Sequence, residues 1–251
     1  MAKIVLQKFI AQSSCCSRRK AEEMIKNSKV QVNGRPAELG MKVDEKDDVR
    51  IYGKKILLSN DKIYIMLNKP AGYTCTNRKF PGEKNVFELL STTNVKTNIG
   101  TTPGLSLRIK KLIIVGRLDK NSRGLVLLTN DGGLAQKLTH PKFEHEKEYI
   151  VVTGHCPATT DMIIKKLNNG IDIGEGDGIV KTKNINYLGN NKFKIILTQG
   201  KKRQIRRMFK ALGCEVTGIL KTRIGNLKLN DLPAGRWRFL NNEEIKKLKS
   251  V

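Results

Sequence analysis

The sequence predicts an α+β protein: a small N-terminal unit of two helices and a β-ribbon, then a domain built on a mixed, largely antiparallel sheet with flanking helices. Two observations predict this class. The first 60 residues combine helical apolar spacing with a hairpin signal, whereas the later residues hold many short apolar segments. Several of these segments follow one another with no helical pattern between them, which indicates antiparallel pairing. We therefore expect domains at residues 1–60 and 61–251.

The N-terminal unit shows its elements in order. Apolar residues recur at helical spacing within 5–10, and the hydroxyl of Ser17 can cap a second helix over 18–27. Two valines then alternate with polar residues before Asn33 and Gly34, a pair that strongly favours a hairpin. A further short strand is expected over 47–56.

The second helix of this unit begins with three cations, Arg18, Arg19 and Lys20. Cations at a helix N-terminus oppose the helix dipole, which favours acids there. A local cost of this kind suggests a use elsewhere, because free N–H groups and cations at a helix start can bind a phosphate. We expect these three residues to bind RNA; a solvated basic face is the alternative.

A short polar joint over 57–64 precedes the larger domain, which mixes strand and helix patterns. Apolar segments typical of strands lie at 63–67, 111–116, 125–129, 149–154 and 192–200. Helical patterns lie at 86–90, 133–139, 160–167 and 201–212. The polar stretch 91–111 has no periodicity and is expected to be a long loop.

The charge balance predicts a polyanionic partner. The chain holds 48 Lys and Arg against 23 Asp and Glu, a formal net charge of +25. Such an excess attracts RNA, DNA or an anionic membrane surface. No apolar run approaches the roughly 18–20 residues that span a bilayer, and the N-terminus lacks the apolar core of a signal peptide. We expect a cytoplasmic, monomeric protein that binds nucleic acid and no membrane.

Neither a metal nor a cofactor is expected. The five cysteines form no C-x-x-C pair and the three histidines do not stand at zinc spacing from them, so reduced, mostly buried thiols are predicted. The acids of "IDIGEGDG" lack the spacing of a calcium loop and indicate a glycine-rich turn. No glycine pattern of a phosphate-binding or dinucleotide-binding loop occurs, so no nucleotide cofactor is expected.

The helix expected over 201–212 presents its cations unequally. Its apolar stripe includes Ile205, and Gly213 ends it. At about 100° per residue, Arg206 falls on the border between core and solvent and could point into a cleft, whereas the other cations fall outside the stripe. The cations expected to contact RNA phosphates are Lys201, Lys202, Arg203 and Arg207. Full solvation of all of them is the alternative.

One acid, Asp119, stands in "GRLDKNSRGLVLLTND" between two apolar strands and among cations. Opposite charge favours the ionised carboxylate, which suits a nucleophile or an electrostatic stabiliser better than a general acid. The alternative is a turn residue satisfied by a local salt bridge. Tyr149 opens another apolar strand, where it could stack on a base or simply pack against the core.

These segments together resemble the RsuA/RluB/RluE/RluF family of bacterial ribosomal RNA pseudouridine synthases. "GRLDKNSRGLVLLTND" resembles the family's G-R-L-D signature, in which Ser122 stands for Thr and Val126 for Leu. "YIMLNKPAGYTCT", "KEYIVVTG", "TQGKKRQIRRMFKALG" and "PAGRWRFL" are similar to its other motifs. "CCSRRKAEEMIKNSKVQVNG" is similar to an S4 RNA-binding domain, so residues 1–60 would be that domain and 61–251 the synthase domain.

The resemblance implies a role for each matched residue. Asp119 would be the catalytic aspartate, Tyr149 would stack on the target uracil and help remove the C5 proton, and Arg206 would pair with Asp119. Arg117 and Arg123 would face the phosphates beside a flipped-out uridine. The carboxylate would attack C1′ or remove a proton from C2′, and the base must leave the stack to reach it. The family uses no metal or cofactor.

Three functions compete. "LTQGKKRQIRRM" and "LKTRIGNLKL" favour the members that modify 23S rRNA, RluF-like or RluB-like, over the RsuA-like members that modify 16S rRNA. A non-catalytic protein that binds rRNA or a pre-ribosomal particle would have no reason to keep Asp119, Tyr149 and Arg206 together. A methyltransferase is disfavoured because no cofactor-binding glycine loop follows a strand.

Overall fold

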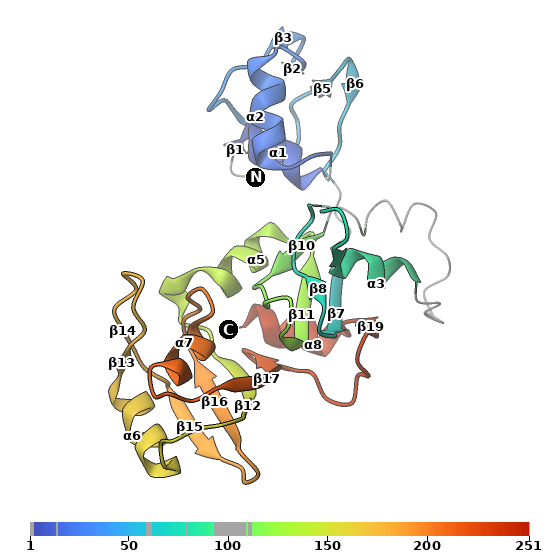
Figure 1. The fold of residues 1–251 in the computed structure, drawn as a ribbon. Coiled ribbons are helices and arrows are strands. Elements are labelled where there is room, and N and C mark those ends of the chain that lie inside the picture. The colour runs from blue at the N-terminus through green and yellow to red at the C-terminus, as the bar shows by residue number, and fades with distance from the viewer. Residues whose placement is uncertain are drawn as a thin grey trace. The chain divides into compact units, whose positions relative to one another are not determined.

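The computed structural model describes residues 3–13, 15–58, 62–78, 80–92, 109 and 112–250 of the chain (Figure 1). Two compact units make up the chain. The first contains residues 1–63, 101–113 and 130–132, and the second contains residues 64–100, 114–129 and 133–251. The stretch 91–111, predicted as a long loop, lies outside the described residues except for Ser91, Thr92 and Ile109.

The first unit contains the two predicted helices and a β-ribbon. The helices are α1 (Leu6–Gln12) and α2 (Arg18–Lys26), and the backbone N–H of Lys20 donates to the hydroxyl of Ser17, which caps α2 as predicted. The strands are β1 (Ile4–Val5), β2 (Val30–Val32), β3 (Arg35–Pro36), β4 (Lys42–Val43), β5 (Val49–Ile51) and β6 (Lys54–Lys55). Four of them form a sheet in the order β3-β2-β5-β6, while β1 pairs with β4.

The hairpin predicted at Asn33 and Gly34 joins β2 to β3. Both residues have positive φ, 53° and 80°, which is the conformation that this residue pair tolerates best. One apolar cluster holds the unit together, with Leu6, Ile10 and Val30 fully buried in it. Helix propensity alone would not hold helices this short, so the packing of their apolar faces stabilises them.

The second unit is organised around a nine-stranded sheet in the order β15-β16-β12-β17-β11-β7-β19, with β10 added to β11 and β18 to β17. The bounds are β7 (Tyr64–Lys69), β10 (Ile113–Val115), β11 (Arg123–Thr129), β12 (Lys147–Thr153), β15 (Asn184–Tyr187), β16 (Lys192–Leu197), β17 (Val216–Ile224), β18 (Leu227–Lys228) and β19 (Trp237–Phe239). Strands β11 and β17 pair in parallel, whereas β7, β12, β15, β16 and β19 pair antiparallel with their neighbours. The predicted mixed, largely antiparallel sheet is confirmed.

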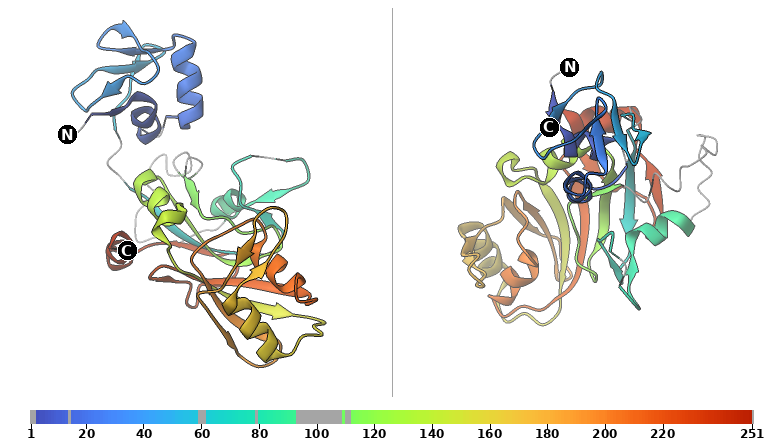
Figure 2. Two further views of the ribbon diagram at one scale, coloured as in Figure 1. Left: turned by 90° about the vertical axis from the view of Figure 1, so that its left-hand side faces the viewer. Right: turned by 90° about the horizontal axis from the view of Figure 1, so that it is seen from above.

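Short helices flank this sheet. They are α3 (Val86–Thr92), α5 (Gly132–Thr139), the 3-10 turn η1 (Pro141–Phe143), α6 (Thr160–Asn169), α7 (Gln204–Lys210) and α8 (Asn242–Lys249). Two small ribbons accompany them, β8 (Tyr73–Thr74) with β9 (Lys84–Asn85), and β13 (Ile171–Asp172) with β14 (Ile179–Val180). Figures 1 and 2 show α6 and the β13–β14 hairpin beside α7 in this unit.

The second unit differs from the prediction at helix α7 and in several elements that were not predicted, among them β15 and the short strands β8, β9, β13, β14 and β18. Helix α7 begins at Gln204 and not at Lys201, because Arg203 before it adopts a left-handed conformation with φ of 50°. The strands β17 and β19 and the helix α8 were not predicted at all. Strand β17 spans nine residues, but Lys221, Thr222 and Arg223 interrupt its apolar pattern, so alternation alone does not reveal it. Among the described residues, no helix has the length and apolar character to cross a bilayer.

Gly124 in β11 lies directly against the backbone of β17, with no room for a side chain. Its φ is +110°, and a Cβ added there would lie 2.3 Å from the carbonyl oxygen and 2.6 Å from the nitrogen of Lys221 on β17. We expect Gly124→Ala to lower the free energy of unfolding of this unit by on the order of 3 kcal/mol, because backbone atoms must move. Guanidinium unfolding followed by the fluorescence of Trp237, the chain's one tryptophan, measures it.

Gly132 provides the control for this prediction. A Cβ added at Gly132 would meet only the Ile113 side chain, at 3.8 Å, and no positive φ constrains it. Gly132→Ala should therefore change the unfolding free energy by less than about 1 kcal/mol. Equal effects of the two substitutions would contradict the close strand approach.

Candidate active site

A small pocket of about 110 Å³ in the second unit brings together three residues that lie far apart in the sequence: Asp119, Tyr149 and Arg206. They come from the turn between β10 and β11, from β12, and from α7. Other residues of the lining are Arg117, Ser122, Gln199, Lys201, Arg203 and Gln204. The pocket thus joins one acid, one aromatic ring and several cations.

Hydrogen bonds to backbone carbonyls hold the turn that carries Asp119. The backbone N–H of Ser122 donates to the Asp119 carbonyl at 3.0 Å, and the buried ammonium of Lys69 donates to the carbonyl of Lys120 at 3.0 Å. The N–H of Gly72 donates to that same Lys120 carbonyl at 2.8 Å. The Asp119 side chain itself is exposed. The backbone is therefore fixed while the carboxylate remains accessible from the pocket.

Tyr149 lies in β12, a strand paired on both sides, and its side chain is only 9% exposed. Burial, and then the nearby Asp119 carboxylate, raise the pKa of the Tyr149 hydroxyl well above its usual range. The phenol therefore stays neutral at physiological pH. Its ring is rigidly held and offers a flat apolar surface in the pocket wall.

Arg206 is half-buried, as the helical geometry predicted for the border of α7. Its Nη1 donates to the carbonyl of Val216 at 2.7 Å, which fixes the guanidinium against the start of β17. Within the described residues, no carboxylate oxygen lies within 4.0 Å of this guanidinium. The ion pair expected between Arg206 and Asp119 is therefore not formed in this structure, although both residues line the same pocket.

Arg207 differs from the prediction of an outward-facing phosphate contact. Its side chain is 11% exposed, because the β13–β14 hairpin covers it. Its Nη1 pairs with Asp177 at 2.5 Å, and the guanidinium also donates to the carbonyls of Ile173 and Gly174. Lys201 donates to the carbonyl of Asp177 in that hairpin. The glycine-rich turn is thus an anchor for the start of α7, which a helical wheel cannot show.

The other expected phosphate contacts have different positions. Arg117 and Arg203 line the pocket, whereas Arg123 is exposed at the start of β11 and does not line it. Lys202 is 80% exposed. In the first unit Arg18, Arg19 and Lys20 are all exposed at the start of α2, and Lys20 pairs with Glu23 at 2.6 Å.

The sequence alone did not single out two buried lysines near the pocket, Lys69 and Lys221. Lys69 is fully buried, and its ammonium donates to the carbonyls of Pro70 and Lys120. Lys221 is 2% exposed and lies across from Tyr149 in the sheet. Lys69 follows an apolar strand in "YIMLNKP", which could have revealed it; Lys221 lies in the unpredicted strand β17.

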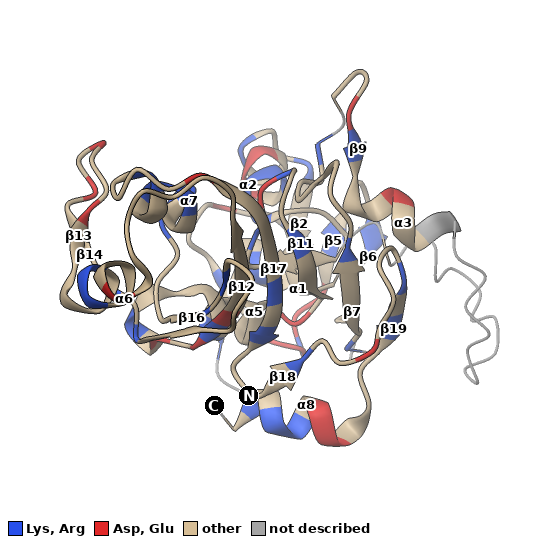
Figure 3. Ribbon diagram, turned by 60° about the horizontal axis from the view of Figure 1, so that its bottom comes forward, with Lys and Arg blue, Asp and Glu red and all other residues tan. Residues whose placement is uncertain are grey.

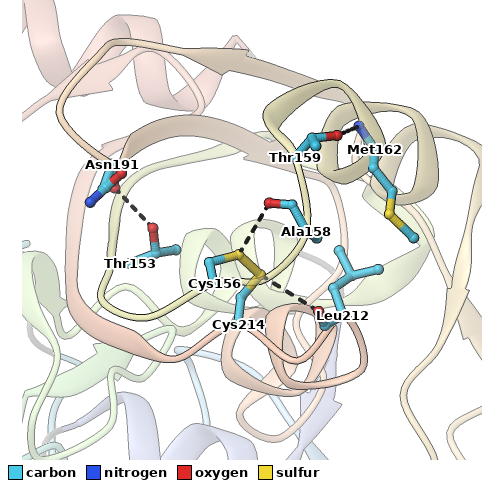
Figure 4. Close-up of a disulfide and its surroundings, with 8 residues drawn as sticks. All are labelled: Thr153, Cys156, Ala158, Thr159, Met162, Asn191, Leu212 and Cys214. Atoms are coloured by element: carbon cyan, nitrogen blue, oxygen red, sulfur yellow. Dashed lines mark hydrogen bonds between the residues drawn. A yellow bond between two sulfur atoms is a disulfide. The ribbon is translucent and has the colours of Figure 1, made fainter.

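The cysteines also differ from the prediction. Cys156 and Cys214, 58 residues apart in the sequence, form a disulfide, whereas Cys15, Cys16 and Cys75 are not disulfide-bonded. Figure 4 shows the bridge next to Thr159, whose side chain caps α6. The disulfide joins the segment between β12 and α6 to the segment between α7 and β17. Sequence spacing cannot show that two distant thiols meet, so all five were expected to be reduced.

The second unit carries many of the basic residues that give the chain its net positive charge. Figure 3 shows Lys and Arg on α7 and along β17. Among the described residues, no group of three or more His, Cys, Asp or Glu side chains is arranged to hold a metal ion.

Comparisons with known proteins identify the family of the chain. The model of the RNA pseudouridylate synthase family matches residues 63–211, and that of the S4 domain matches residues 6–49. The chain is 35% identical to the ribosomal large subunit pseudouridine synthase B of Bacillus subtilis, covering 98% of this chain and 96% of that protein. It is also 35% identical to the dual-specificity RNA pseudouridine synthase RluF of Salmonella typhi, covering 96% and 76%. A pseudouridylate synthase crystal structure superposes with a TM-score of 0.67 at 28% identity, covering 98% and 99%.

Proposed function

Because the chain belongs to the RNA pseudouridylate synthase family and is an RNA pseudouridine synthase with an N-terminal S4 domain, we propose that its substrate is ribosomal RNA. We propose further that it modifies a uridine of 23S rRNA and that Asp119 is the catalytic residue. One observation carries the proposal: Asp119, Tyr149 and Arg206 meet in one pocket of about 110 Å³. This volume is well below the roughly 300–1,000 Å³ of typical ligand sites, and it suits a single flipped-out base.

The proposed chemistry uses these residues directly. Isomerisation breaks the N1–C1′ bond of uridine, forms a C5–C1′ bond, and moves the C5 proton to N1. The Asp119 carboxylate either attacks C1′ or removes a proton from C2′. The neutral ring of Tyr149 stacks on the uracil, and two exposed cations of the lining, Arg117 and Arg203, bind the flanking phosphates.

Arg206 would contribute charge to the same pocket. Its guanidinium is fixed by the Val216 carbonyl, and we infer that a bound RNA brings Asp119 into contact with it. The relatives named for the large ribosomal subunit support 23S rRNA as the substrate. Mapping pseudouridines in the rRNAs of cells with and without this protein tests the proposal. Loss of one 23S pseudouridine is expected; loss of one in 16S rRNA, or in neither, would refute the 23S assignment.

The S4 domain should supply affinity through Arg18 and Arg19. Removing both by Arg18→Ala with Arg19→Ala should weaken binding to rRNA fragments and lower the slope of log affinity against log salt by about 0.7–0.9 for each phosphate that is no longer neutralised. Fluorescence anisotropy at several salt concentrations measures the slope. A control variant, Arg35→Ala with Lys54→Ala, removes the same charge from β3 and β6 of the same unit. Equal slopes in the two variants would exclude a specific role for the start of α2.

A further inference from the structure

Lys221 is a buried cation that the proposed mechanism does not use. It lies in β17 and is 2% exposed, yet no carboxylate lies within 4.0 Å of its ammonium in the part of the chain that the structure describes. A lysine without a buried anionic partner is costly in a core, and an apolar residue would pack there at lower cost. Residues that break a local rule of this kind concentrate at functional sites.

Lys221 does not line the pocket, but it lies next to residues that form or support it. In the sheet it pairs with Tyr149 of β12 on one side and with Gly124 of β11 on the other. Its Nζ lies 6.0 Å from the centre of the Tyr149 ring. The same Nζ would lie 3.6 Å from a Cβ added to Gly116, at the start of the segment that leads to Asp119. The ammonium therefore lies next to both the aromatic wall and the segment that carries the acid.

The ionisable groups around Lys221 leave its charge uncompensated. Lys147 of β12 is another cation, whose ammonium donates to the carbonyls of His145 and Thr198. Cys75, after β8, is a buried thiol whose pKa burial raises, so it is neutral at physiological pH. Lys69 donates to backbone carbonyls, and Asp119 lies in the turn above. No carboxylate among the described residues therefore neutralises Lys221 beside the Tyr149 ring.

We propose that Lys221 is a positioning residue that holds the Tyr149 ring against the Asp119 turn and provides positive charge behind the uracil when the glycosidic bond breaks. When N1–C1′ breaks, its electron pair stays on the uracil, which becomes anionic until C5 bonds to C1′. A fixed charge in a water-poor site stabilises such a transient anion more strongly than in water. Lys221 gives up no proton in the cycle. The proposal rests on the proposed function.

The test compares Lys221→Met, which keeps the length and removes the charge, with Lys221→Arg, which keeps the charge. Single-turnover pseudouridine formation is measured at saturating RNA, and RNA affinity is measured separately. We expect Lys221→Met to slow the reaction at least about tenfold with an unchanged affinity, and Lys221→Arg to recover most of the rate. Lys192→Met removes an exposed lysine of β16 as a control and should match the wild type. An unchanged rate in Lys221→Met, or equal loss in both Lys221 variants, would overturn the proposal.

A pH profile tests the charge without relying on Lys221→Met. Burial, and then the positive charge of Lys147, lower the pKa of Lys221 to about 7, so the ammonium form is lost as the pH rises above that value. The wild-type rate at low RNA concentration should therefore fall above pH of about 7, and Lys221→Arg should lack that fall. The same fall in both proteins would refute the role of this charge. A wild type that makes no pseudouridine at any pH would instead refute the proposed function.

Discussion

Replacing Asp119 by asparagine is expected to abolish pseudouridine formation while RNA binding survives. The asparagine side chain keeps the shape of aspartate but cannot act as a nucleophile or a base. Loss of a group in either role slows enzymes by roughly 10³-fold or more. The backbone of the turn is held by Ser122, Lys69 and Gly72 and not by the carboxylate, so the fold should not change.

A single-turnover assay with an rRNA fragment, together with an affinity measurement on the same RNA, checks this expectation. Asp131→Asn is the matched control, because Asp131 lies beyond the end of β11 and does not line the pocket. Turnover by Asp119→Asn within tenfold of the wild type would rule out a direct chemical role for Asp119. Loss of RNA affinity in that variant would show that the carboxylate acts in binding instead.

Replacing Lys221 by methionine is expected to stabilise the second unit, with an effect that depends on pH. The pKa of Lys221 is lowered to about 7 in the folded protein, against roughly 10.4 in an unfolded chain. Below the folded value both states carry the proton, so the full penalty for burying the charge is present. Between the two values the unfolded chain binds more protons, so wild-type stability rises with pH. The penalty is on the order of 4 kcal/mol.

Guanidinium unfolding followed through Trp237 at pH 6, 8 and 9.5 measures this effect. The free energy of unfolding of Lys221→Met should exceed that of the wild type most at pH 6, and this difference should shrink as the pH rises towards 9.5. Lys192→Met should track the wild type at every pH. A pH-independent difference would contradict the low pKa. A variant that is more stable yet slower would show that the wild type gives up stability for activity at this position.

Much of the fold could be predicted from the sequence because its elements carry local signals. The cap at Ser17, the hairpin at Asn33 and Gly34 and the apolar run of β11 each depend on a few neighbouring residues. Strand β17 escaped prediction because its identity comes from pairing with β11 and β12, not from its own alternation. The cations of β17 gave this segment the polar pattern typical of exposed residues.

Some features of the candidate site could also be predicted from local patterns, whereas others could not. The position of Arg206 at the edge of the core follows from helical geometry, and the structure agrees. The covering of Arg207 by Asp177 and the disulfide between Cys156 and Cys214 depend on chain segments brought together by the fold. A role for Lys221 could not be predicted without knowing that it lies across the sheet from Tyr149. Local sequence patterns do not predict contacts between residues that lie far apart in the sequence.

The strand order has a consequence for a chain made from its N-terminus on a ribosome. Strand β17 lies between β12 and β11, but β12 ends at Thr153 and β17 begins at Val216, and β7 gains its outer neighbour only with β19. The catalytic unit therefore completes its sheet only near the end of synthesis. The helices and strands of the S4 domain all lie before residue 56 and can assemble much earlier. A nascent chain thus acquires its RNA-binding module well before the candidate pocket exists, and a product that stops before Val216 would retain the module without the complete synthase sheet.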